Sequence, residues 1–130
     1  MMTFPVSTKA IKNALQPALV ASGQSFATGV VVTNQGMPPS NRPARAVIIV
    51  RASGSRLNAF DTALLGITVW SANVNEIDDL AHLVADTLPT LGSHDVPALE
   101  TLSGPNDIDM DGTYYRRYIT ASASMRALTV

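Results

Sequence analysis

The chain has 130 residues, of which 46% are hydrophobic and only 15% are charged, and its formal net charge is −1. This length predicts a single domain, over residues 1–130, with a hydrophobic core of its own. The near-neutral charge excludes the basic excess typical of nucleic-acid-binding proteins, and the absence of cysteine excludes disulfides and thiolate metal sites.

The low proportion of charged residues is the first indication of function. Soluble domains usually have about a quarter of their residues charged, so part of this surface is expected to face another protein. We therefore favour an oligomer or assembly subunit over a monomer. Seven of the nine basic residues are arginine, which suits fixed ion pairs at interfaces. No stretch has the apolar length of a signal peptide or membrane span, so we expect a soluble protein, made in the cytoplasm, without membrane contact.

The N-terminal part predicts a helix and then a strand. Apolar residues at helical spacing indicate a helix over 7–22, which Gly23 closes. Pro17 lies inside this pattern and is expected to kink or divide the helix. A valine-rich run then predicts a strand over 27–33.

The middle of the chain predicts a loop and two strongly apolar strands. Residues 34–44 are rich in proline and asparagine and predict a loop with nothing to pack. A strand is expected at 45–51, followed by a turn or bulged connection at 52–61. The next strand, 63–70, is apolar on both alternating faces, which is typical of a central strand covered on both sides.

A second helix follows this central strand. The apolar period changes from two to about 3.6, and Asn73 with Glu76 resembles a capping box at the start of the helix. Gly92 is the expected C-terminal stop. We expect Trp70 to be buried together with the apolar stripe of this helix. The stripe consists of Ile77, Leu80, Ala81, Val84, Leu88 and Leu91.

The C-terminal part predicts two strands. A short strand at 98–102 is expected to break at Gly104-Pro105 and can continue through Ile108 and Met110. The last strand, 118–126, has the clearest apolar–polar alternation in the chain. The predicted fold is therefore α+β, with a mainly antiparallel sheet of about four to five strands and two main helices packed on one face.

An acidic motif is the strongest candidate for chemistry. Asp107, Asp109, Asp111 and Gly112 match the first half of an EF-hand loop, in which alternate carboxylates converge on Ca²⁺. The bidentate glutamate of that loop is missing, because Tyr118 stands at the twelfth position counted from Asp107. The favoured alternative is an Asp-Gly turn between two strands.

Other residues give weaker signals. His82 and His94 lack metal-ligand partners at a useful spacing, so surface positions are favoured. No serine lies in a G-x-S-x-G elbow, and no glycine pattern indicates a phosphate site. Residues 114–117, Tyr-Tyr-Arg-Arg, can stack on single-stranded nucleic acid, but pairing with nearby acids at the start of a strand is favoured. We expect neither a cofactor nor an enzymatic activity.

A family resemblance extends over much of the chain. The block from residue 47 to 88 and the segments after it resemble the tail terminator proteins of long-tailed bacteriophages, especially those of actinobacterial hosts. The resemblance covers about two-thirds of the chain. Its departures are Ser71, where alanine is commoner, and Ser55, where a second glycine often stands. The matching residues are Val50-Arg51, Gly54, Arg56, Asn58, Asp61, Trp70-Ser71 and Asp79 to Leu83.

The resemblance implies a structural virion protein that forms a homo-oligomeric ring, expected to be a hexamer. Such a ring caps the tail tube and joins it to the head through the neck, so the implied partners are the tail tube protein and the head-closure protein. DNA passes through the ring without specific binding, and the protein resides in the virion tail or neck. Two alternatives stay open: another neck component, such as a head-closure or adaptor protein, and a small ligand-binding or hydrolytic α+β domain.

The charged residues around two segments are the expected subunit or stacking contacts. The first group orders the turn after residue 51 or bridges adjacent subunits, and the acids of the second group face the lumen, an axial rim or a basic neighbour. The segments 34–44 and 103–113 are expected to become ordered only against neighbouring subunits in a stack. The candidate contact residues are Arg51, Arg56 and Asp61 in the first group, and Asp107, Asp109, Asp111, Arg116 and Arg117 in the second.

Overall fold

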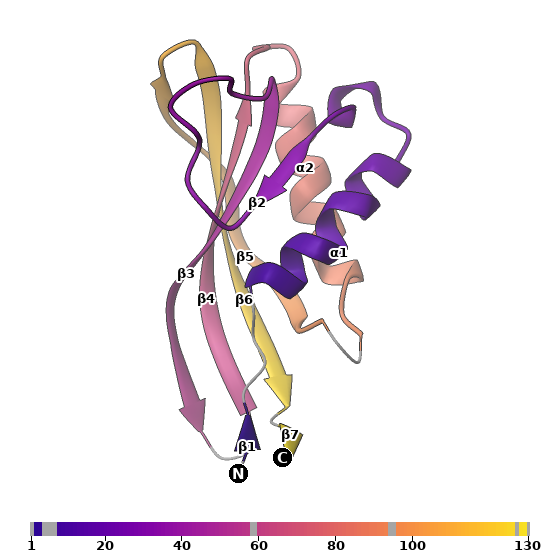
Figure 1. Ribbon diagram of the computed structural model, residues 1–130, viewed down its shortest axis with the longest axis vertical. Helices are drawn as coiled ribbons and strands as arrows, with labels where there is room; N and C mark the ends of the chain where they lie inside the picture. The colour runs from indigo at the N-terminus through magenta and orange to yellow at the C-terminus, as the bar shows by residue number, and fades with distance from the viewer. Residues whose placement is uncertain (1, 4–7, 58–59, 94–95, 127, 130) are drawn as a thin grey trace.

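The computed structural model describes residues 2–3, 8–57, 60–93, 96–126 and 128–129. Two helices lie on the same side of a five-stranded mixed sheet, so the predicted α+β fold is confirmed (Figure 1). The helices are α1 (Thr8–Ala21) and α2 (Ile77–Thr87). The strands of the main sheet are β2 (Val31–Thr33), β3 (Arg45–Leu57), β4 (Phe60–Ser71), β5 (Ala98–Asp111) and β6 (Tyr114–Arg126).

The main sheet has the strand order β2-β3-β4-β6-β5. All neighbouring strands are antiparallel except β2, which pairs in parallel with β3 at one edge. Near the chain ends, β1 (Met2–Thr3) pairs with β7 (Leu128–Thr129) and forms a separate two-stranded sheet, which the sequence pattern did not predict. β4 therefore occupies the centre of the sheet, as its apolar sequence predicted.

The main core lies between the two helices and one face of the sheet. Leu65, Ile67 and Val69 of β4 are completely buried on this face because successive strand residues alternate sides. The apolar stripe of α2 packs onto them, and Leu80 and Val84 are also completely buried. α1 contributes Ile11, Leu15 and Leu19 to the same core. The predicted helix stripe is thus confirmed as core.

Trp70 is buried elsewhere than predicted. It is 6% exposed, but it belongs to a second, smaller cluster with Ala46 and Ile48, onto which Met37 and Tyr114 pack. Because Val69 faces the helices, the next residue in the strand must face the opposite side of the sheet. The expectation that Trp70 joins the stripe of α2 is therefore wrong.

The ends of several elements also differ from prediction. α1 continues through Pro17, whose side chain is exposed. The carbonyl group that loses its partner belongs to Asn13, also exposed, so water can satisfy it. The strand predicted from residue 27 begins only at Val31, because Gly29 has a left-handed φ of 68° after a 3-10 turn at Ser25–Ala27.

The predicted capping box at the start of α2 is absent. The Asn73 side chain accepts a hydrogen bond from the amide of Asn75 at 2.8 Å rather than from the first turn of the helix. Glu76 instead binds Arg45. The helix ends at Thr87, and a 3-10 turn at Leu88–Thr90 replaces the last predicted helical turn, where Pro89 cannot donate an amide hydrogen bond.

Two strands are longer than the sequence predicted. The turn expected at 52–61 is instead the continuation of β3 to Leu57 and the start of β4 at Phe60, with a bulge between Arg51 and Ser53. β5 passes through Gly104-Pro105 without ending, because register shifts absorb the irregular residues. Cross-strand pairing thus overrode the local turn signals.

Neither helix has the length and apolar character that a membrane crossing requires, within the part of the chain that the structure describes.

Candidate interaction surfaces

Three connecting segments meet at one end of the molecule. They are the loop 34–44, the β4–α2 connection at 72–76, and the β5–β6 hairpin at 107–117, which lie at the top of Figure 1. We call this region the loop end. The last pair of β3 and β4, Leu57 with Phe60, lies at the opposite end, together with β1 and β7.

The ion pair between Arg45 and Glu76 joins two of these segments. Two nitrogens of the guanidinium donate to the two carboxylate oxygens, at 2.9 Å and 2.8 Å. The hydrogen bond to Glu76 raises the pKa of Arg45, and the same bond lowers the pKa of Glu76. Both side chains are about one-fifth exposed, at 22% and 21%. A fork-shaped pair of this kind fixes the orientation of both groups.

Arg117 joins the third segment to α2. Its Nε lies 2.8 Å from a carboxylate oxygen of Asp78 and 2.8 Å from one of Asp107. The Arg117 side chain is only 14% exposed, whereas the two acids are largely exposed. One partly buried cation thus bridges the first turn of α2 and strand β5. The pairing of this arginine segment with nearby acids, which the sequence favoured over nucleic-acid stacking, is confirmed.

Aromatic rings hold loop 34–44 against the hairpin. The hydroxyl of Tyr114 donates to the Pro43 carbonyl at 2.8 Å, and its ring meets Trp70 edge to face, with centroids 5.9 Å apart. Arg42 lies over the Tyr114 ring at 6.0 Å and pairs with Asp111 at 3.7 Å. The Arg116 guanidinium also contacts the indole and lies 5.1 Å from the centre of the Trp70 ring.

These contacts correct one expectation about the loops. The segments 34–44 and 103–113 were expected to become ordered only against neighbouring subunits. In the structure they are ordered largely against each other and the sheet of the same chain, through Tyr114, Arg42 and Met37. The contacts connect residues more than 70 positions apart, such as Tyr114 and Pro43, so local sequence could not reveal them.

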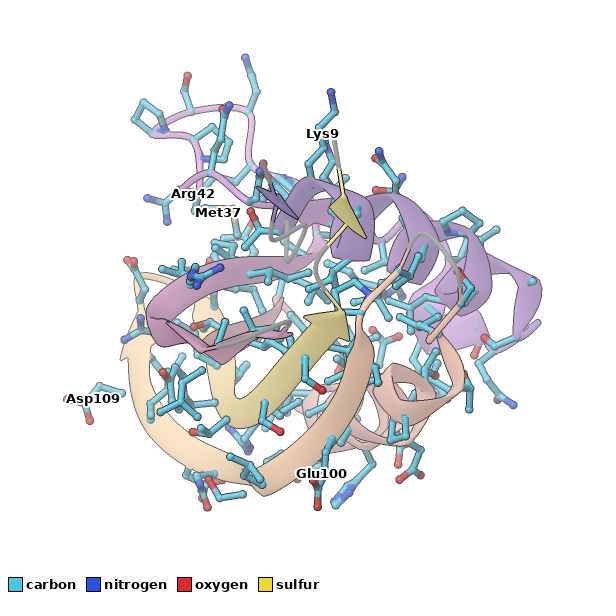
Figure 2. The ribbon with its side chains drawn as sticks, turned by 90° about the horizontal axis from the view of Figure 1, so that it is seen from below. Lys9, Met37, Arg42, Glu100 and Asp109 are labelled. Atoms are coloured by element: carbon cyan, nitrogen blue, oxygen red, sulfur yellow. The ribbon has the colours of Figure 1, made fainter. Side chains whose placement is uncertain are left out.

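The acidic motif forms a strand and a tight turn. Asp107 and Asp109 lie on β5, and Asp111 pairs with Tyr114 across a two-residue turn in which Gly112 has a left-handed φ of 59°. Asp109 points away from the ribbon (Figure 2), while its carbonyl accepts a hydrogen bond from Arg116 Nε at 2.7 Å. The alternative of an Asp-Gly turn is therefore confirmed. Among the residues that the structure describes, no group of three acids or histidines is placed to hold a metal ion.

The other predicted contact residues lie far from the loop end. Arg56 pairs directly with Asp61 across the β3–β4 ladder, one position before the last pair of the hairpin. Arg51 pairs with Leu65, next to the bulge. The side chains of Arg56 and Asp61 lie outside the described residues. The structure thus separates the eight candidate contact residues into two groups at different places along the sheet.

The second candidate surface is the sheet face away from the helices. Val50 is 53% exposed and Leu64 is 41% exposed, and they are diagonal neighbours on adjacent strands because Val50 pairs with Gly66. Thr68, Thr120 and Ser122 continue this face, and the Tyr118 side chain lies across Gly66. We call these seven residues the open sheet face. They carry no charge, and no helix covers them (Figure 1).

The sequence pattern of β4 contains this apolar surface, but it predicted a strand face that the chain itself covers. The apolar residues on the second face of β4 predicted a strand covered on both sides. Only the end of that face, around Trp70, is covered within the chain, by residues of loop 34–44 and by Tyr114. Leu64 remains uncovered because the loop lies near the other end of the strand. The apolar pattern therefore indicates a binding surface as much as an internal core.

The histidines lie outside both surfaces. His82 is exposed on α2, which confirms the predicted surface position, and His94 lies outside the described residues.

Comparisons with known proteins do not add to the geometry: a scan against protein-family models found no match, and neither did a search of curated proteins. The loop end and the open sheet face are therefore the features on which a function can rest.

Proposed function

We propose that this chain is a structural subunit of a bacteriophage virion, a tail terminator that assembles into a ring of six copies. The ring caps the tail tube and joins it to the neck, with the tail tube protein on one side and the head-closure protein on the other. DNA passes through the ring without specific binding. The role is structural and uses neither a catalytic residue nor a cofactor.

The open sheet face is the observation that carries this proposal. An antiparallel sheet can leave a polar face in water, but apolar residues on a sheet face are more stable when helices, a second sheet or another molecule cover them. Here two helices cover one face, while Val50 and Leu64 remain exposed on the other without a charged residue between them. A neighbouring subunit that covers these residues would remove this apolar surface from water.

The residues that carry the family resemblance have structural roles that support the same proposal. Trp70 packs beneath loop 34–44, and Ser71 is 1% exposed at the junction of β4 and α2. Its hydroxyl accepts a hydrogen bond from the Asn73 amide at 3.1 Å, so a small side chain is required there. The strand-to-helix unit thus positions the loop end at one end of the sheet and leaves the sheet face free.

A ring also requires two different contact surfaces on each subunit, because its contacts are heterologous. The open sheet face supplies one of these two surfaces, and the surface of the neighbouring subunit that covers it is the other. The loop end, whose segments are held by Arg45, Arg117 and Tyr114, supplies a surface that can meet a different protein along the ring axis. A docking surface that is already ordered loses little entropy on binding.

The test is assembly of the purified protein with and without a charge on the open sheet face. Light scattering and electron microscopy should show rings of the unmodified chain, alone or after addition of tail tube protein. Leu64→Lys should prevent assembly and leave the monomer folded, because Leu64 is exposed. Val20→Lys is the matched control, since Val20 is 56% exposed on α1, outside both the open sheet face and the loop end. A chain that stays monomeric at high concentration with tube protein present would contradict the proposal.

A further inference from the structure

The single tryptophan of the chain buries a hydrogen-bond donor that has no acceptor. Trp70 is 6% exposed, and its Nε1 is fully buried with no partner among the described residues. A buried donor without a partner is unfavourable, because the same group is hydrogen-bonded to water in the unfolded chain. An acceptor brought to this position would therefore stabilise the protein.

Loop 34–44 covers the cluster that contains Trp70. Met37 packs onto this cluster, and Figure 2 shows Met37 and Arg42 near the base of the loop, with the rest of the loop extending away from the sheet. From residue 35 to 43, a stretch that the structure describes throughout, no backbone amide bonds to a backbone carbonyl. Within the loop, Arg42 Nε donates to the Pro38 carbonyl at 2.7 Å, and this bond can move with the loop, so no backbone ladder over 35–43 resists its displacement.

A few side-chain contacts hold the loop in place. The Tyr114 hydroxyl donates to the Pro43 carbonyl at 2.8 Å. Arg42 and Asp111, which are 29% and 45% exposed, form an ion pair at 3.7 Å. Exposed ion pairs contribute little to stability, so the loop can detach at far lower cost than unfolding the domain.

An open pocket already exists between this loop and the sheet. Its volume is about 410 Å³, and its walls come from the loop and from strands β2 and β3. Every lining residue is uncharged. Two of them, Met37 and Ala46, also belong to the Trp70 cluster, so the pocket and the buried indole are neighbours.

We propose that loop 34–44 is a displaceable cover, and that the surface beneath it, formed by Ala46, Ile48 and Trp70, binds an uncharged apolar segment of a partner protein. An apolar side chain of the partner takes the place of Met37, and a backbone carbonyl accepts the hydrogen bond from Trp70 Nε1. The contact of Met37 with this cluster and the uncharged lining of the adjoining pocket favour an apolar occupant, and the buried Trp70 Nε1 requires that the occupant bring an acceptor. The inference is independent of the proposed ring, since the isolated chain tests it.

The first experiment tests the cover. Tyr114→Phe removes the bond to Pro43 but keeps the ring beside Trp70. Arg42→Gln removes the pair with Asp111 and the hydrogen bond from Arg42 Nε to the Pro38 carbonyl. Each variant should raise amide exchange of residues 35–43 and acrylamide quenching of Trp70 roughly five-fold, as expected for the loss of one hydrogen bond. Tyr115→Phe is the matched control, because Tyr115 packs against the main core. Unchanged exchange and quenching in both variants would show that the loop is a fixed part of the fold.

The second experiment tests the occupant in the Tyr114→Phe variant. The probe is an acetylated and amidated peptide with one methionine between glycines, whose backbone is free to bring a carbonyl to the indole, and the control peptide has aspartate in place of methionine. The chain has one tryptophan, so one indole N–H resonance reports on the site. The probe should move this resonance downfield and protect Trp70 from quenching, and the control peptide should do neither. An opened variant whose indole resonance responds to neither peptide, or equally to both, would overturn the proposal.

Discussion

Single arginine residues hold the loop end together. Arg45 and Glu76 are 31 positions apart, and Arg117 and Asp78 are 39 positions apart, yet each pair forms hydrogen bonds of 2.8 Å. Partial burial makes such pairs stronger than fully exposed ones, because solvent screens them less. If one residue of a pair is removed, its partner becomes a partly buried charge without a counter-charge.

The Arg45–Glu76 pair predicts a pH dependence of stability. The hydrogen bond from Arg45 lowers the pKa of Glu76 in the folded chain below the unfolded value, which is about 4.3. The stabilisation is therefore fully present above that unfolded value and is lost as the pH falls through the folded pKa. Glu76→Gln should reduce the free energy of unfolding at pH 7, and the difference from the unmodified chain should shrink below about pH 4.3. Urea unfolding at a series of pH values measures both.

Asp79→Asn is the control for this prediction, since Asp79 is an exposed acid in the first turn of the same helix. A Glu76→Gln deficit that stays constant as the pH falls well below about 4.3 would show that the variant loses packing rather than an ionic hydrogen bond.

Among the secondary-structure elements, α2 makes the most direct stability prediction. Leu80 is completely buried in the main core between α2 and the sheet. Leu80→Ala should lower the free energy of unfolding by about 2–5 kcal/mol, as large-to-small substitutions in a core do. Val74→Ala, at an exposed position, should change it by about 0.5 kcal/mol or less. A similar small loss for Leu80→Ala, measured by chemical unfolding, would exclude the helix stripe from the core.

The β3–β4 hairpin predicts an effect on assembly. Its outer part extends beyond the two helices (Figure 1), and Arg56 pairs with Asp61 there. A hairpin end that the two helices do not cover is suited to contact a neighbouring subunit. Arg56→Ala should therefore weaken ring formation, measured by light scattering, more than it lowers the melting temperature of the monomer. Normal rings with a sharply lower melting temperature would instead make Arg56 a strut within the subunit.

For the molecule as a whole, the charge balance of the loop end bears on passage of DNA. Asp107 pairs with Arg117 and Asp111 pairs with Arg42, so much of the acidic charge of the hairpin is neutralised within the chain. Replacing Asp107, Asp109 and Asp111 by asparagine would release positive charge. DNA phosphates could then contact the arginines that these acids had neutralised, and each such contact makes DNA binding more dependent on salt.

We therefore expect the triple Asp→Asn variant to retain DNA in assembled rings at low salt and to release it at high salt, as a filter-binding titration would measure. A variant with Asp79→Asn and Asp86→Asn removes exposed acids of α2 and serves as the comparison, and DNA retention by this variant instead would place the acids of α2 at the lumen. Normal DNA behaviour combined with failed docking to the head would assign the hairpin acids to the stacking face and not to the lumen.

Local sequence patterns were enough to specify the regular elements and the main core. Apolar residues on both alternating faces of β4 placed it at the centre of the sheet. A period near 3.6 placed Leu80 and Val84 in the helix stripe, and the alternation of β6 was correct at Ile119 and Ala121. These patterns are local, because each element must present one apolar surface wherever its partners come from.

The tertiary structure decided which of these surfaces pack against each other. The face of β4 that carries Trp70 became a separate cluster because both helices lie on the other face. The strands β3 and β5 extend through turn-like residues because their partner strands continue the pairing on both sides of each bulge. Glu76 binds Arg45 instead of capping its own helix. These outcomes depend on pairs of residues far apart in the chain, and local propensity is too weak to specify them against cross-strand pairing and burial.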